Sequence, residues 1–225
     1  MLSHNQETKD FSNINEYSLE EEKLNIISHT IGLVLSIIAL VLLISRAKSY
    51  NDILHITSAG IFGVSLILLY AASTLYHNAN NPKLRFKLKI FDHSAIYVLI
   101  AGTYTPFTLI TLNGNTGWLI FIISWGMALI GIILKLFFTG KYNLISTLMY
   151  VFMGWMIVFA IKPLIANLPA YGLYWLVAGG VSYTLGAIIY SLKKVKFNHA
   201  IFHVFVLVGS FCHFYSVYFY VLSRQ

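Results

Sequence analysis

Histidine side chains gather near the ends of apolar runs in this sequence. His199 and His203 are four residues apart, so a helix over this segment places both imidazoles on one face. His77 closes a second apolar run, with Ser73 one turn before it, and Asp92 opens a third run. Ionisable side chains are costly to bury in apolar surroundings, so each of these residues is a candidate functional group.

These residues suit a metal site. Zinc binds imidazole nitrogens in tetrahedral geometry, and catalytic zinc sites keep three protein ligands and one water. His77, His199 and His203 would supply three nitrogens from two helices. Asp92 would hold the water as a hydrogen-bond partner or general base, and Ser73 would bond the same water or a substrate oxyanion. The spacing alone also fits histidines that only contact lipid head groups at a membrane interface.

Three further histidines have simpler expected roles. His29 is expected either beside the metal site or at the membrane interface. His93 is expected to be a packing or interface residue, because it points about 100° away from Asp92 on a helix. His213 follows His203 by ten residues, about 15 Å along a helix, and is expected to be a buried hydrogen-bonding histidine.

The composition is that of a membrane protein. The 225 residues are 58% hydrophobic and 10% charged, with a mean hydropathy of +0.74, whereas an ordinary soluble domain is about 25% charged. The net charge of +7 could suggest nucleic acid, but the Lys and Arg residues stand in short breaks between apolar runs. That pattern is typical of an orientation signal, so we expect membrane lipids and no nucleic acid as partners. The single cysteine, Cys212, excludes a disulfide within the chain.

Seven apolar runs predict an all-α, polytopic bundle of seven transmembrane helices. Each run is near the roughly 20 residues that cross a bilayer, and none shows the alternation of a membrane barrel strand. Residues 25–225 are therefore expected to form one transmembrane domain. The predicted spans are about 25–45, 53–77, 91–112, 117–138, 142–162, 172–192 and 199–222.

Several details of the spans are also predicted. The charged breaks at 78–89 and 162–169 are expected to be loops between spans. Pro106 is expected to kink the third helix, because proline removes a backbone donor within a helix. Gly179, Gly180 and Gly186 are expected to let the sixth helix approach a neighbour closely.

The segment 1–24 differs from the rest of the chain. It is polar and acidic, and it lacks the basic start, short apolar core and cleavage site of a signal peptide. Ser18 followed by Glu21 indicates a capping box at the start of the first helix. We therefore expect a polar N-terminal segment that leads directly into the first span.

The distribution of basic residues predicts the orientation. Eleven of the 15 Lys and Arg residues fall on the side of the N-terminus and four on the other side. Basic residues are enriched in cytoplasmic loops, so the N-terminus is expected in the cytoplasm and the C-terminus outside. The residues at the ends of spans two, three and seven, namely His77, Asp92, His199 and His203, then lie at the cytoplasmic end.

Four strings of residues resemble the hemolysin III family, the bacterial branch of the progestin and adiponectin receptor (PAQR) superfamily. The similarity runs from about Glu22 to the C-terminus and includes Asn25, His29 and Gly32. The strings are Ser73 to His77 (STLYH), Phe91 to Pro106 (FDHSAIYVLIAGTYTP), His199 to His203 (HAIFH) and Gly209 to Tyr215 (GSFCHFY).

The resemblance implies a seven-helix protein of the bacterial plasma membrane with a zinc site. The family's motif histidines fall on His77, His199 and His203, its acid on Asp92 and its serine on Ser73. Relatives in the wider group are associated with zinc-dependent hydrolysis of lipid amides. Three functions therefore stay open: a zinc-dependent hydrolase of membrane lipid amides or esters, a non-enzymatic membrane-homeostasis or stress protein with structural zinc, and a cytolysin or pore-former.

The orientation leads to a first prediction. A reporter that is active only outside the cytoplasm, fused after Gln225, is expected to be active, because seven spans and a cytoplasmic N-terminus place the C-terminus outside. A cytoplasmic reporter signal from that fusion would contradict either the span count or the orientation.

Overall fold

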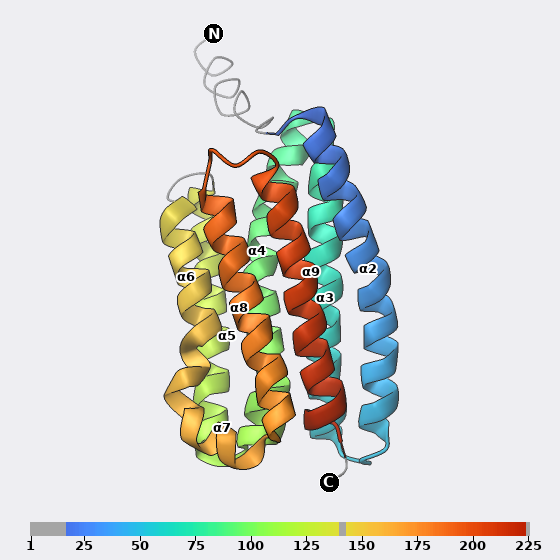
Figure 1. Cartoon of the computed structure of the whole chain (residues 1–225), viewed down its shortest axis with the longest axis vertical. Helices are drawn as coiled ribbons and strands as arrows, with labels where there is room; N and C mark the ends of the chain where they lie inside the picture. Colours follow the sequence, from blue (N-terminus) through green and yellow to red (C-terminus); the bar gives the residue numbers. More distant parts are fainter. Residues whose placement is uncertain (1–16, 140–142, 224–225) are drawn as a thin grey trace.

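The computed structural model describes residues 17–139 and 143–223, and over these residues it contains seven helical segments that are long and apolar enough to cross a membrane. The segments run side by side along the long axis of the molecule (Figure 1). The predicted all-helical architecture with seven spans is thereby confirmed. Residues 1–16 of the polar segment, and Arg224 from the charge count, lie outside the described residues.

Three of the seven spans combine several helical elements, and the seventh span joins α9 to a π-helical turn η3. The third span joins α4 to a π-helical turn η1, and the fifth joins α6, a 3-10 turn η2 and α7. The elements are α2 (Leu19–Lys48), α3 (Ile53–Asn78), α4 (Pro82–Pro106), η1 (Phe107–Leu112), α5 (Gly114–Phe138), α6 (Asn143–Trp155), η2 (Met156–Ala160), α7 (Ile161–Asn167), α8 (Ala170–Ser191), α9 (Asn198–Ser216) and a final π-helical turn η3 (Val217–Val221).

The start of α2 follows the predicted cap, with one change. Ser18 Oγ accepts a hydrogen bond from the Glu21 backbone N–H at 3.2 Å, which satisfies one of the free donors of the first turn. The Glu21 carboxylate does not return this bond to Ser18. It accepts the backbone N–H of His199 at 3.1 Å instead, so it joins the starts of α2 and α9.

The predicted loop at 78–89 was wrong over most of its length. Helix α4 begins at Pro82, where proline suits the first helical position, and Asn81 caps it by accepting the Leu84 N–H at 3.1 Å. The basic residues after Pro82 therefore lie on the first turns of α4, and two of them, Arg85 and Lys89, are buried. The loop was predicted because charged residues usually face solvent. Here two of the charged side chains are buried inside the bundle, so the segment is helical.

The predicted loop at 162–169 was also wrong, since α7 covers 161–167. Pro163 lies in the first turn of α7, where its missing N–H costs little. The fifth span is broken one turn earlier. There the Tyr104 hydroxyl donates to the Met153 carbonyl at 2.7 Å and accepts the Ile157 N–H at 2.8 Å, so a side chain from α4 supplies hydrogen bonds at the break.

The regular part of α4 ends at Pro106, and the chain continues as η1. Proline cannot donate to the carbonyl one turn before it, so the hydrogen-bond pattern changes at this residue. Threonine hydroxyls supply nearby donors: Thr105 Oγ1 bonds the Ala101 carbonyl at 3.0 Å and Thr108 Oγ1 bonds the Tyr104 carbonyl at 2.9 Å. The irregularity falls at the predicted position.

Helix α4 is the most enclosed of the seven spans. Of the most apolar 18 residues of this span, 72% are buried, compared with 28% in the corresponding stretches of α2, α5 and α8. Helix α4 packs against α3, α5 and α6, and α2 packs against α3 and α9. The outer helices carry exposed apolar side chains such as Ile38, Val41 and Phe159, which suits a surface that faces lipid.

Glycine allows close helix contacts at two of the three predicted positions and at others. A Cβ atom on Gly179 would lie 2.6 Å from Cε1 of His213, and one on Gly186 would lie 2.9 Å from Cβ of Phe205, both on α9. Gly32 on α2 meets the Tyr70 ring of α3 in the same way, at 2.4 Å from Cδ1. These distances are too short for any side chain larger than hydrogen. At Gly180 a Cβ atom would lie 3.6 Å from Cζ2 of Trp155, which is an ordinary contact, so glycine is not required there.

Gly32 leads to a second prediction. The substitution Gly32→Ala forces the Tyr70 ring or α2 to move, and overpacking of this kind costs about 1–3 kcal/mol. We expect a lower thermal unfolding midpoint in detergent than for the wild-type protein. Gly126→Ala is the matched control, because nothing lies within 4 Å of a Cβ at Gly126. Equal midpoints for the two variants would contradict the packing described here.

Candidate metal centre

Three buried histidines converge at one end of the bundle. His77 lies in the last turn of α3, and His199 and His203 lie in the first two turns of α9. The Nε2 atom of His199 is 3.1 Å from Nε2 of His77 and 3.0 Å from Nε2 of His203. Each residue is at most 5% exposed. The structure therefore brings together the three residues that the sequence predicts as metal ligands.

The spacing of these nitrogens is close to that of a tetrahedral metal site. With metal–nitrogen bonds of about 2.0–2.1 Å, two ligands of a tetrahedral ion lie about 3.3 Å apart. One ligand atom from each of His77, His199 and His203 lies within 4.8 Å of the other two. A small adjustment of the rings would seat one ion between them.

The other ring nitrogens of these histidines define which atoms carry protons. The Glu22 carboxylate lies 2.6 Å from Nδ1 of His77 and accepts a hydrogen bond from its N–H group. Ser28 Oγ lies 3.0 Å from the Asn25 carbonyl and 3.3 Å from Nδ1 of His203, so when the hydroxyl donates to the carbonyl it accepts a hydrogen bond from Nδ1–H of His203. A neutral imidazole carries one N–H, so Nε2 of both His77 and His203 presents a lone pair to the centre.

His199 cannot satisfy both of these lone pairs. Its Nδ1 lies 3.2 Å from the Tyr17 hydroxyl, and its Nε2 lies between the other two Nε2 atoms. A single N–H on His199 could donate to only one of them, which leaves a buried acceptor without a partner. A metal ion accepts lone pairs from all three nitrogens at once, so the donor set fits a metal.

Glu22 links the centre to the rest of the fold. Besides His77, its carboxylate pairs with the Arg85 guanidinium at the start of α4. Arg85 also donates to the carbonyls of Tyr76, His77 and Ala79 at 3.2–3.3 Å, which satisfies carbonyls at the end of α3. A carboxylate that accepts from a ligand histidine is a common support of metal sites, because it fixes the ring and its tautomer.

Sequence reasoning missed these supporting residues. It treated Glu22 as part of an acidic helix start and did not assign roles to Tyr17 or Ser28. Arg85 was expected to be one of the basic residues around the site that attract anionic head groups, but it is buried and pairs with Glu22. A signal was present on α2, where buried residues recur every three or four positions and several of them are polar. This stripe consists of Glu21, Asn25, His29, Gly32 and Ser36.

Asp92 and Ser73 lie beside the three histidines. Asp92, on α4, is 7% exposed, and its carboxylate lies within electrostatic range of His77 and next to Ser73. It does not belong to the group of ligand atoms that lie within 4.8 Å of one another. Ser73 Oγ is buried within reach of the Asp92 carboxylate, and no other partner for it is found in the described part of the chain. Both side chains therefore have capacity to bind a water or a substrate atom.

The other histidines divide between the centre and its surroundings. His29 is buried and its ring stacks on His203 with centroids 3.5 Å apart, and neither of its nitrogens has a hydrogen-bond partner among the described residues. His93 Nδ1 bonds the Lys89 carbonyl at 2.8 Å. His213 is buried, as expected, and its ring lies within reach of the backbone of Gly209.

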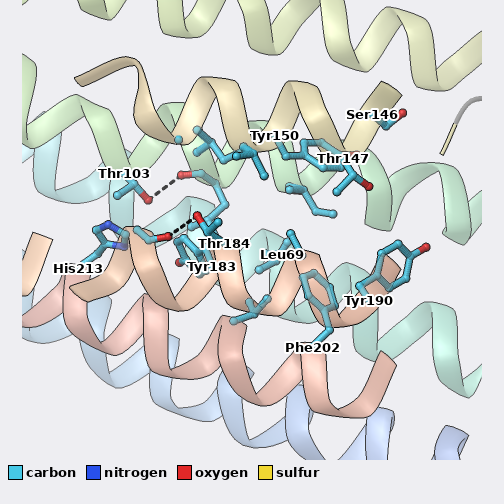
Figure 2. A pocket seen from close by; sticks show the side chains of 18 of the residues that line it. Leu69, Thr103, Ser146, Thr147, Tyr150, Tyr183, Thr184, Tyr190, Phe202 and His213 are labelled. Carbon is cyan, nitrogen blue, oxygen red and sulfur yellow. Dashed lines mark hydrogen bonds between the residues drawn. The ribbon is translucent and has the colours of Figure 1, made fainter. Parts of the chain in front are cut away.

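A cavity of about 150 Å³ extends from the centre along the bundle, between α4, α6, α8 and α9. Asp92, His199 and His203 line it at the centre, and apolar side chains line most of the remainder. Figure 2 shows Tyr190 towards one end and His213 towards the other. A cavity of about 10–15 Å³ already holds a single water, so this cavity has room for part of an apolar chain.

Comparison with known proteins identifies the family that the sequence motifs resemble. The family model described as Haemolysin-III related matches residues 17–214. The chain is 50% identical to "Hemolysin-3" of Bacillus cereus over 204 residues, which covers 91% of this chain and 93% of that protein. It is 49% identical to "Hemolysin-3 homolog" of Bacillus subtilis (strain 168) over 207 residues, 92% of this chain and 97% of that protein.

A more distant relative is found in mammals. The chain is 27% identical to "Monocyte to macrophage differentiation factor" of Homo sapiens over 211 residues, 89% of this chain and 84% of that protein. The matched regions include all three ligand candidates, His77, His199 and His203, within 17–214. With seven apolar helices and these relatives, the chain is a multi-pass membrane protein that belongs to the hemolysin III family.

Proposed function

We propose that this protein is a zinc-dependent hydrolase that cleaves an amide or ester bond of a membrane lipid. One observation carries the proposal: three imidazole nitrogens converge on one point at the side of a largely apolar cavity. A site that only needed to hold a metal would not require a cavity of this size beside it. An amphiphile could place its chain in the cavity and its polar bond at the centre.

The donor set supports zinc as the metal. Three neutral imidazoles suit zinc, and three protein ligands with one further position are typical of catalytic zinc sites. When bound, zinc would lower the pKa of a water molecule towards about 7 and polarise a carbonyl group. His77, His199 and His203 would be its ligands.

The remaining residues of the centre provide the other functions of a hydrolase. Asp92 would accept a proton from the attacking water, since its carboxylate is buried beside the ligands and is not one of them. Ser73, whose hydroxyl is buried beside Asp92, would donate its proton to the oxygen of the bond under attack. Glu22 and Ser28 would hold His77 and His203 with their Nδ1 protons away from the centre.

The same end of the bundle carries most of the exposed basic residues. These lie at the start of α4 and in the α8–α9 connection, next to the ends of the helices that bear the ligands, and comprise Lys83, Lys87, Lys193, Lys194 and Lys196. Basic residues accumulate on the cytoplasmic side and attract anionic head groups. We therefore propose that the centre lies at the cytoplasmic leaflet of the bacterial plasma membrane.

A second candidate is a non-enzymatic membrane protein with a structural metal. The centre joins three helices, because α3 and α9 supply the ligands and α2 supplies Glu22 and Ser28. A metal held there would stabilise the packing of these helices. The name "Hemolysin-3" of the Bacillus cereus relative suggests membrane lysis as a third candidate, which leakage from dye-loaded liposomes would test.

Metal content gives a third prediction. The purified protein is expected to hold about one zinc per chain, measured by elemental analysis. His77→Ala, and the double substitution His199→Ala with His203→Ala, should lose it. Glu22→Gln should weaken zinc binding by about 10–100-fold, because it removes the carboxylate that orients His77. Glu20→Gln changes an exposed carboxylate two residues earlier and should have no effect. Full zinc content in His77→Ala would contradict the ligand assignment.

Hydrolysis gives a fourth prediction. The zinc-loaded protein in lipid micelles is expected to release fatty acid from long-chain ceramide or from an acylated amine lipid, detected by mass spectrometry. Asp92→Asn should retain zinc and lose about 10²–10⁴-fold in rate, because it removes the proton acceptor. Unchanged turnover in Asp92→Asn would contradict the role given to this residue. Wild-type protein that holds zinc, loses thermal stability when the metal is removed and turns over neither lipid class would favour the structural metal.

A further inference from the structure

A lysine is enclosed inside the bundle beside the cavity. Lys135 lies on α5, one turn before the end of that helix, and is 2% exposed. It lines the cavity together with residues of α4 and α6. Within the described ranges 17–139 and 143–223, its ammonium group has no hydrogen-bond acceptor and no carboxylate partner. The charged group that acts on it is Lys89 of α4, which carries the same charge.

A buried cation without a counter-ion is unfavourable. Transfer of an ammonium group out of water costs several kcal/mol even after the protein relaxes, and a like charge nearby adds to this cost. Lys135 is enclosed between helices and apolar side chains cover the outer helices, so water offsets its charge less than it would at an open surface. An anion inside the cavity would supply the missing partner.

Several hydroxyl groups lie on the side of the cavity where Lys135 is found. Gly131, one turn before Lys135, packs directly against the Tyr97 ring. The Tyr97 hydroxyl lies beside Ser146 and Tyr150 of α6, and both of those residues line the cavity with Lys135. Figure 2 shows Ser146 and Tyr150 on the α6 side of this pocket. The N-terminal end of α6 also lies here, and its helix dipole favours a negative charge.

We propose that this part of the cavity binds the phosphate head group of a membrane phospholipid, with Lys135 as its counter-ion and an acyl chain in the apolar part. Phosphate has several acceptor oxygens, and an ammonium group with neighbouring hydroxyls supplies several donors. The inference does not require the metal centre to be catalytic. It gives the cavity a second polar contact, distinct from the three histidines.

A simpler role for Lys135 is a general attraction to the membrane surface. Long basic side chains extend along apolar surface and place the charge in the head-group region. Lys87 provides the matched control, because it is exposed at the same end of the neighbouring helix α4. Loss of either charge would weaken a general attraction equally, whereas a specific phosphate site depends on Lys135 alone.

The test measures binding, without turnover, to the delipidated full-length protein in an uncharged detergent. The probes are 1-palmitoyl lysophosphatidate, palmitate and monopalmitoyl glycerol, which share one acyl chain and differ in head group. We expect lysophosphatidate to bind at least tenfold more tightly than monopalmitoyl glycerol. Lys135→Met should abolish this difference, Lys135→Arg should retain most of it, and Lys87→Met should leave it unchanged.

Three results would overturn the proposal: equal affinity for lysophosphatidate and monopalmitoyl glycerol, tighter binding of palmitate than of lysophosphatidate, or wild-type affinity in Lys135→Met. If Lys135→Met does not fold, acylation of lysine side chains in the wild-type protein replaces it. Lysophosphatidate should then protect Lys135 and leave Lys87 reactive, and equal reactivity of Lys135 with and without the lipid would contradict the site. Failure here leaves the hydrolase proposal standing, because no bond cleavage is measured.

Discussion

The buried Nε2 atom of His199 lies about 3 Å from those of His77 and His203, and the arrangement of the surrounding helices depends on how these contacts are satisfied. Glu22 and Ser28 accept hydrogen bonds from Nδ1–H of His77 and His203, which leaves the Nε2 lone pairs directed at the centre. Buried acceptors without donors are unfavourable. A metal ion resolves the conflict, and it requires α2, α3 and α9 to meet at the same level.

Contacts around the three histidines connect the ends of several helices. Arg85 connects Glu22 to the last carbonyls of α3, so the ends of three helices share one hydrogen-bond network. Helix α4 runs from this network through the middle of the molecule. Its first half brings Asp92 to the centre, and its second half lines the cavity before the change of helix type at Pro106. One helix therefore positions both the polar and the apolar parts of the site.

The sequence predicted what depends on local pattern. Seven apolar runs predicted the spans, and the positions of His77, His199 and His203 near the ends of those runs predicted their meeting. It did not predict contacts that depend on tertiary packing, such as Glu22 with His77. The loop at 78–89 was misassigned because charge usually indicates solvent, whereas Arg85 is buried and neutralised by Glu22. The orientation in the membrane and the roles of Asp92 and Ser73 stay predictions.

The location of the metal tests the central claim most directly. Crystals of the protein purified with zinc, measured at the zinc absorption edge, would give an anomalous difference map that shows only the metal. We predict one strong peak per chain, about 2.0–2.1 Å from Nε2 of His77, His199 and His203. A map with no peak between these three side chains, or with the peak at other residues, would contradict the metal centre.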